Sequence, residues 1–307
     1  MWDNVKVLYI IFGLLLIHLT ASQGQEECGR LRESQLYDRN EITSADEYTW
    51  IGRVGYENSD NGAIEFHCLS VLIHQRFAIL PAHCVLNIPK ADATFILFGD
   101  WQAQQNFTDG DCRKVKGFVQ CTTPPQRVDI EELVVHPQYK SAGTLDGLNF
   151  NIALAKLERI VDFTDFVQPI CLPPTGEDRD KHIGLRLEWA GFDKPRDVED
   201  LELENIEDEW RVKTQLQVAS LQFCNSKIWN RRPLFENHLC SAGDKKSDLL
   251  WGSPLMAFEV LDGKPRNFYL VGIQISSISA PGEDLDSFLF MRILPFRSWI
   301  QKNIKYN

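Results

Sequence analysis

Two histidines each directly precede a cysteine, in the pairs His67-Cys68 and His83-Cys84. Imidazole nitrogen and thiolate sulfur are donors that zinc prefers, so these four groups could hold a zinc ion. The same cysteines could instead form disulfides, which would consume their sulfur atoms as metal ligands. The choice depends on the redox compartment, because disulfides persist in oxidising environments outside the cytosol.

The amino-terminal sequence indicates that the protein enters an oxidising compartment, where the cysteines would form disulfides. Residues 7–17 are apolar throughout, Lys6 lies before them, and the small residues Ala21 and Gly24 follow. This is the pattern of a secretory signal peptide, which we place at residues 1–24. The apolar run is too short for a membrane-spanning helix, which needs about 20 residues. The sequence therefore predicts a secreted, extracellular protein with disulfides in place of a metal site.

Composition narrows the possible partners. The chain has 307 residues, of which 44% are hydrophobic, and it carries a net charge of -11 with eight cysteines. This length suits one large domain or two small ones. The negative charge argues against nucleic acid and membranes as partners, because both present negatively charged surfaces. We expect neither a cofactor nor a metal ion.

Short apolar runs separated by polar turns dominate the chain, which predicts β-strands. Residues 66–73 and 76–80 form a hairpin pattern that leads directly into His83. Helical spacing is confined to residues 221–229 and to an amphipathic segment at 295–304, where Trp299 should point inward. Further strands are predicted at residues 216–220, 254–258 and 288–293.

Three segments resemble motifs of the chymotrypsin-like (trypsin family) serine proteases, and in particular the insect clip-type members. The segment ending in Ala82-His83-Cys84 is similar to Thr-Ala-Ala-His-Cys, and Asn151-Ile152-Ala153-Leu154 is similar to Asp-Ile-Ala-Leu. Residues 249–255 align with Gly-Asp-Ser-Gly-Gly-Pro-Leu. The resemblance covers roughly residues 28–305. It implies further strands at residues 93–101, 130–138, 149–157, 187–192 and 267–273. It implies an all-β fold of two six-stranded antiparallel barrels with a C-terminal helix.

The resemblance also implies a domain organisation. A segment at residues 25–46 is similar to the disulfide-tethered light chain of the family, and residues 47–307 correspond to the protease domain. No Arg followed by the family's Ile/Val-x-Gly occurs near residue 39, so the cleavable activation switch is missing.

The same alignment predicts a degenerate active site. His83 matches the general base, but Asn151 replaces the acid and Trp251 replaces the nucleophilic serine. Leu249 stands where the family has its oxyanion-hole glycine, and Leu250 where it has the activation aspartate. Neighbouring Ser247 and Ser253 would need a rebuilt turn to act as nucleophiles. The resemblance thus points to a protein that is not an enzyme.

The resemblance implies how the cysteines pair, and the chain also carries a glycosylation sequon at Asn106-Phe107-Thr108. The disulfides implied by family position are Cys68–Cys84, Cys112–Cys121, Cys224–Cys240 and Cys28–Cys171.

The implied function is that of a secreted non-catalytic homologue, a regulatory cofactor or binding module in an extracellular protease cascade of innate immunity or melanisation. Its partners would be extracellular proteins, such as cascade proteases or their zymogen substrates. Two alternatives stay open: an active trypsin-like endopeptidase, which Trp251 opposes, and a recognition protein for a microbial surface. The acidic segment 193–209 is a solvated loop or a docking surface for a basic partner.

Overall fold

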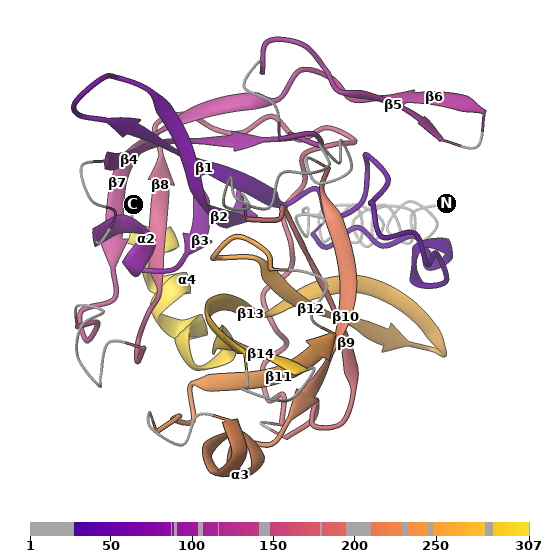
Figure 1. Ribbon diagram of the computed structural model, residues 1–307, viewed down its shortest axis with the longest axis vertical. Coiled ribbons are helices and arrows are strands. Elements are labelled where there is room, and N and C mark those ends of the chain that lie inside the picture. Colours follow the sequence, from indigo (N-terminus) through magenta and orange to yellow (C-terminus); the bar gives the residue numbers. More distant parts are fainter. Residues whose placement is uncertain are drawn as a thin grey trace, which may run out of the picture.

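A computed structural model shows how these predicted strands assemble (Figure 1). It describes residues 28–86, 88, 91–103, 107–115, 117–140, 148–178, 180–194, 210–228, 233–244, 248–279 and 285–306.

The first half of the chain closes into a six-stranded antiparallel barrel in the order β1-β2-β3-β8-β7-β4. Runs of consecutive buried residues in β1, β2, β3 and β8 contribute to a continuous core that includes Val54, Leu72 and Leu154. The strands of this barrel are β1 (Ile51–Asn58), β2 (Ile64–His74), β3 (Phe77–Leu80), β4 (Ala91–Phe98), β7 (Gln126–Val135) and β8 (Ala153–Leu157).

The second half closes into another antiparallel barrel of six strands, in the order β10-β11-β14-β13-β12-β9. Trp189, Phe288 and Phe290 pack against one another in its interior. Two closed barrels confirm the predicted fold class. The strands are β9 (Arg186–Gly191), β10 (Val212–Ala219), β11 (His238–Asp244), β12 (Pro254–Leu261), β13 (Lys264–Ser279) and β14 (Leu285–Arg292).

The helices are short and lie at the ends of strands. The helical spacing at residues 221–229 gives α3 (Leu221–Phe223) and a π-helical turn, η4 (Cys224–Ile228), while α2 (His83–Leu86) follows β3. The C-terminal helix α4 (Arg297–Tyr306) follows the 3-10 turn η5 (Leu294–Phe296), and its half-buried Trp299 packs against the core as predicted. Among the described residues, no helix combines the length and apolarity needed to cross a bilayer.

The N-terminal segment is attached to the second barrel. Cys28 is bonded to Cys171, Arg30 forms a β-bridge with Asn267 of β13, and the 3-10 turn η1 (Glu33–Leu36) follows. A small hairpin of β5 (Cys112–Val115) and β6 (Phe118–Cys121) extends away from the first barrel (Figure 1). The Cys112–Cys121 disulfide joins its two strands. The domain boundaries themselves stay predictions.

Candidate functional site

The three residues aligned with a catalytic triad meet between the two barrels. Leu80 of β3 pairs with Ala153 of β8, so the antiparallel register brings His83, just beyond β3, beside Asn151, just before β8. Trp251 reaches the same place from the second barrel, because its carbonyl accepts a 2.6 Å hydrogen bond from the Leu69 amide of β2. The His83 and Trp251 rings meet edge to face, with centroids 5.9 Å apart.

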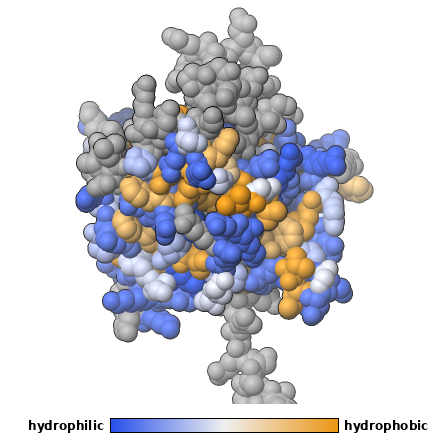
Figure 2. Space-filling view, turned by 90° about the horizontal axis from the view of Figure 1, so that it is seen from below, coloured by the Kyte–Doolittle hydropathy of each residue, from blue (hydrophilic) through white to orange (hydrophobic). Residues whose placement is uncertain are grey.

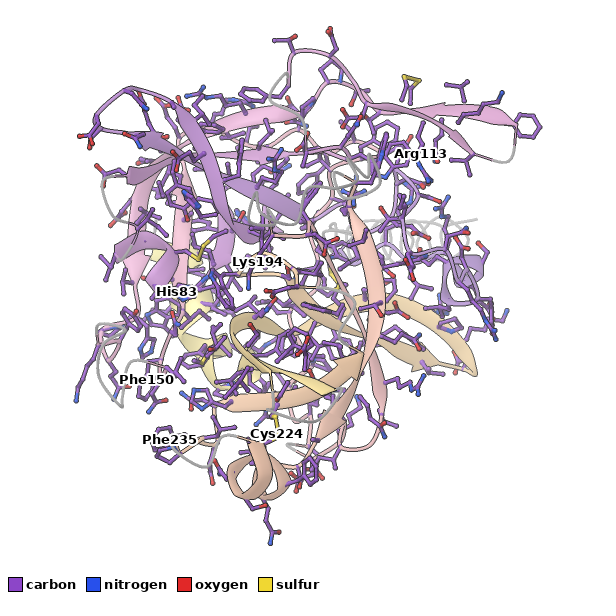
Figure 3. The ribbon with its side chains drawn as sticks, in the orientation of Figure 1. His83, Arg113, Phe150, Lys194, Cys224 and Phe235 are labelled. Carbon is purple, nitrogen blue, oxygen red and sulfur yellow. A yellow bond between two sulfur atoms is a disulfide. The ribbon has the colours of Figure 1, made fainter. Side chains whose placement is uncertain are left out.

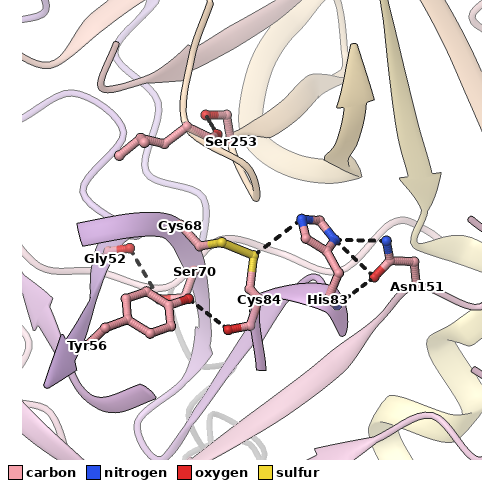
Figure 4. Close-up of a disulfide and its surroundings, with 9 residues drawn as sticks. Gly52, Tyr56, Cys68, Ser70, His83, Cys84, Asn151 and Ser253 are labelled. Carbon is pink, nitrogen blue, oxygen red and sulfur yellow. Dashed lines mark hydrogen bonds between the residues drawn. A yellow bond between two sulfur atoms is a disulfide. The ribbon is translucent and has the colours of Figure 1, made fainter. Parts of the chain in front are cut away.

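Asn151 is joined to His83 by three contacts (Figure 4), of which the longest, 3.3 Å, runs from Asn151 Oδ1 to His83 Nδ1. The backbone amide of His83 donates to Asn151 Oδ1 at 3.0 Å, which fixes the orientation of the side-chain amide. The Asn151 amino group then lies 2.9 Å from His83 Nδ1 and donates to it. In a neutral imidazole that accepts at Nδ1, the proton sits on Nε2. His83 Nε2 faces the Cys84 sulfur at 3.7 Å. Because Nε2 already carries the proton in this tautomer, it has no lone pair with which to accept another.

Burial keeps the His83 imidazole neutral. Desolvation is the main cause that lowers the pKa of His83 to about 4, and the positive charge of Lys194 adds to it. An unfolded histidine titrates near pH 6.5. The neutral ring therefore contributes stability above that pH, and this stability is lost as the pH falls from about 6.5 toward 4.

Asn151→Asp is expected to raise the pKa of His83 by about one to three pH units, because a carboxylate at hydrogen-bond distance favours the imidazolium. An NMR titration of the His83 ring measures this directly. Asn149→Asp is the matched control, since Asn149 bonds to Asn237 and not to His83. An unchanged His83 titration in Asn151→Asp would contradict the hydrogen-bond assignment.

Trp251 is covered by a cation from the loop after β9. The Lys194 ammonium lies 3.5 Å from the centroid of the Trp251 ring, and it also pairs with Asp248 at 2.7 Å. Partial burial lowers the pKa of Lys194, and the Asp248 carboxylate beside it opposes that shift. A cation over an indole face is the strongest of the common cation–π arrangements. In Figure 3 the labelled Lys194 and His83 both lie in the region between the barrels.

The turn around Trp251 is packed with apolar side chains. Leu249 is fully buried in the core of the second barrel, and Leu250 is buried in the main core cluster. Ser253 is also fully buried, and its hydroxyl donates a 2.7 Å hydrogen bond to the Leu250 carbonyl. This hydroxyl is therefore engaged within its own turn.

The structure contains the four disulfides that the resemblance implies: Cys28–Cys171, Cys68–Cys84, Cys112–Cys121 and Cys224–Cys240. Cys68, His83 and Cys84 cluster closely enough to suggest a metal site. The two sulfur atoms are bonded to each other, however, and a disulfide is not the thiolate that zinc binds.

Four predicted features lie outside the described residues: the signal peptide at residues 1–24, the sequon residue Asn106, Ser247, and positions 195–209 of the acidic segment. The roles of Lys194 and Asp248 are absent from the sequence-based predictions. These two residues are 54 positions apart, and no local pattern links them. Their contact depends on the β-bridge between Asp193 and Leu249.

Comparisons with known proteins agree with this architecture. The family model described as Trypsin matches residues 40–300. The chain is 27% identical over 285 residues to "Melanization protease 1" of Drosophila melanogaster, covering 91% of this chain and 68% of that protein. It is 28% identical over 290 residues to "Phenoloxidase-activating factor 1" of Holotrichia diomphalia, covering 91% and 73%.

Among solved structures, the chain is similar to the Drosophila Grass clip serine protease of the Toll pathway. The TM-score is 0.73 at 22% identity, and the match covers 92% of this chain and 76% of that one. At this level of identity the likeness concerns the fold.

Proposed function

Because this chain belongs to the trypsin family, we propose that it is a non-catalytic member that serves as a regulatory cofactor or binding module in an extracellular protease cascade. Its partners are cascade proteases or their zymogen substrates. The names of its relatives support the cascade role, since they refer to melanization and to phenoloxidase activation.

One observation carries the proposal: the side chain that meets His83 from the second barrel is that of Trp251. Peptide hydrolysis in this family starts with attack by a serine hydroxyl. An indole has an N–H donor but no nucleophilic atom. Covalent catalysis of the family type therefore has no starting group here.

The neighbours of Trp251 support the same proposal. His83 carries its proton on Nε2, the nitrogen that a general base would need to keep free. The buried Leu249 replaces the glycine of the oxyanion hole, and Leu250 cannot form the ion pair that activates the family. Each change affects a different requirement of the reaction, so replacing one residue would not restore it.

We expect no labelling of the secreted protein by a fluorophosphonate probe, which reacts with activated serines. The result should be the same before and after treatment with trypsin, once the trypsin is inhibited. Active trypsin in a parallel sample is the positive control. Stoichiometric labelling of any serine in this chain would falsify the non-catalytic assignment.

The cascade role is tested with His83→Ala. Purified protein is added to cell-free insect haemolymph, and phenoloxidase activity is followed after the cascade is triggered. A regulatory cofactor should change the rate of activation, and His83→Ala should change it equally. No effect of either protein would exclude this cascade, whereas an effect lost in His83→Ala would indicate that His83 chemistry is used.

A further inference from the structure

A groove of about 890 Å³ lies apart from Trp251, between the segment that follows β7 and the loop that precedes β11. His136 and Phe150 line one side, Phe235 lies in the opposing loop, and Phe296 of η5 also contributes. In Figure 3 the labelled Phe150 and Phe235 lie at the same edge of the molecule. The volume is typical of small-molecule sites, which span about 300–1,000 Å³.

The groove also borders α3, through Leu221. Figure 2 views the molecule from the side of α3, where apolar side chains reach the surface between polar ones. An open, partly apolar depression on such a face is accessible to a ligand from solution.

Phe150 adopts an unusual backbone conformation beside the groove. Its φ of 56° lies in the left-handed region, which costs a bulky residue roughly 1–2 kcal/mol. The ring stacks on His136 at 5.1 Å with an interplanar angle of 7°, and it meets Phe296 edge to face at 6.1 Å. His136 in turn contacts Trp299. The groove thus has a rigid aromatic wall.

Side-chain amides supply the polar groups of the groove. Asn237 donates one hydrogen bond to Asn149 Oδ1. Within the described part of the chain, this leaves the Asn149 amino group, Asn237 Oδ1 and the Gln138 side-chain amide without partners. An amide offers donors and acceptors together, as a ligand hydroxyl group also requires.

The charged residues that line the groove are Glu177, Glu236 and Arg292, and the side chains of Glu177 and Arg292 are engaged in contacts within the chain. The Glu177 side chain is only 3% exposed, and it pairs with His182 at 3.1 Å and with Lys181 at 3.3 Å. The Arg292 guanidinium donates to the Glu236 carbonyl at 3.2 Å. A charged ligand would therefore have to compete with these internal partners, whereas a neutral one would not.

We propose that this groove binds a neutral saccharide. The C–H face of a pyranose ring is apolar and packs on aromatic rings, while its hydroxyl groups both donate and accept hydrogen bonds. The aromatic wall and the unpaired amides match these two properties. The proposal does not rest on the cascade role, because the groove lies apart from Trp251 and uses none of the residues that contact it.

The test titrates the full secreted protein with two neutral probes, the hexamer of N-acetylglucosamine and laminarihexaose. Calorimetry measures affinity, and tryptophan fluorescence reports the site through Trp299. Binding of at least one probe is expected. Phe235→Ser and Gln138→Ala should each weaken it at least tenfold, because both side chains line the groove on exposed segments. Phe118→Ser, on the distant hairpin and 80% exposed, is the matched control and should bind normally.

Circular dichroism confirms that each variant is folded before its titration is interpreted. The two probes distinguish an amide-bearing sugar from a plain glucan. Absence of binding by both at millimolar concentration would overturn the proposal. Binding that neither groove variant weakens would also overturn it, since the sugar would then sit elsewhere. The proposal would also be overturned if a proline-rich decapeptide, at equal or lower concentration, displaced the bound hexamer. That result would assign the groove to peptides.

Discussion

Lys213→Met is expected to lower the free energy of unfolding by about 3–5 kcal/mol, because it leaves a buried carboxylate without its cation. The Lys213 ammonium lies 3.0 and 3.1 Å from the two oxygens of Glu47. Only 5% of the Lys213 side chain and 2% of the Glu47 side chain are exposed. Urea denaturation with the disulfides intact, followed by tryptophan fluorescence, measures the change.

This ion pair holds the segment that follows residue 39, near which the family resemblance places the activation site. Residues 41–47 run beside the start of β10, with a β-bridge between Ile42 and Val212 and a 2.8 Å hydrogen bond from the Lys213 amide to the Glu41 carbonyl. In an active family member the corresponding segment inserts its new amino terminus into the protease domain. Here Leu250 could not receive that terminus, so the ion pair has a structural role.

Two further variants separate burial from charge. Arg30→Met removes a surface pair with Asp165, whose side chains are 50% and 75% exposed, and should cost less than about 1 kcal/mol. Lys213→Met combined with Glu47→Leu removes both buried charges and should recover most of the lost stability. A loss below about 1 kcal/mol in Lys213→Met alone would mean that the pair is effectively solvated.

The sequence was sufficient for the parts of the site that depend on local motifs. The hairpin before His83 and the Ile-Ala-Leu pattern after Asn151 predicted two strands, and their antiparallel register necessarily brings these two residues together. The identity of Trp251 was likewise evident, because Pro254 and Leu255 fix the alignment. Chemistry that depends on residue type at a known backbone position is predictable from sequence.

Contacts that depend on loop geometry were not predictable. Lys194 was visible only as one of the few basic residues in an acidic segment, yet in the structure it covers the Trp251 ring. Phe150 was visible only as the residue before Asn151, and nothing local indicates its left-handed φ or its stacking on His136. Both contacts depend on how the loops at the ends of the strands are placed, and no local spacing in the sequence indicates them.

The largest effect is expected for Gly252→Ala, which should lower the free energy of unfolding by at least about 4 kcal/mol or prevent folding. Gly252 has a φ of 89°, in the left-handed region. A Cβ at this position would lie 2.0 Å from the Leu69 carbonyl oxygen, and backbone atoms cannot move aside as a flexible side chain can. The Gly252 amide also donates a 2.9 Å hydrogen bond to the Gln274 carbonyl of β13. This glycine therefore joins the two barrels.

Gly263→Ala separates the two causes of that loss. Gly263 has a similar φ of 74°, but nothing lies within 4 Å of the position that an added Cβ would occupy in this hairpin turn. Gly263→Ala should lower the free energy of unfolding only through the left-handed φ that alanine would have to adopt, by roughly 1–2 kcal/mol. Thermal unfolding of both variants gives the comparison, and equal losses would contradict a steric role for Leu69.

The steric contact at Gly252 also explains which glycines of the family turn this chain keeps. Leu249 can replace a glycine whose amide served catalysis, whereas Gly252 occupies a position that the backbone itself requires.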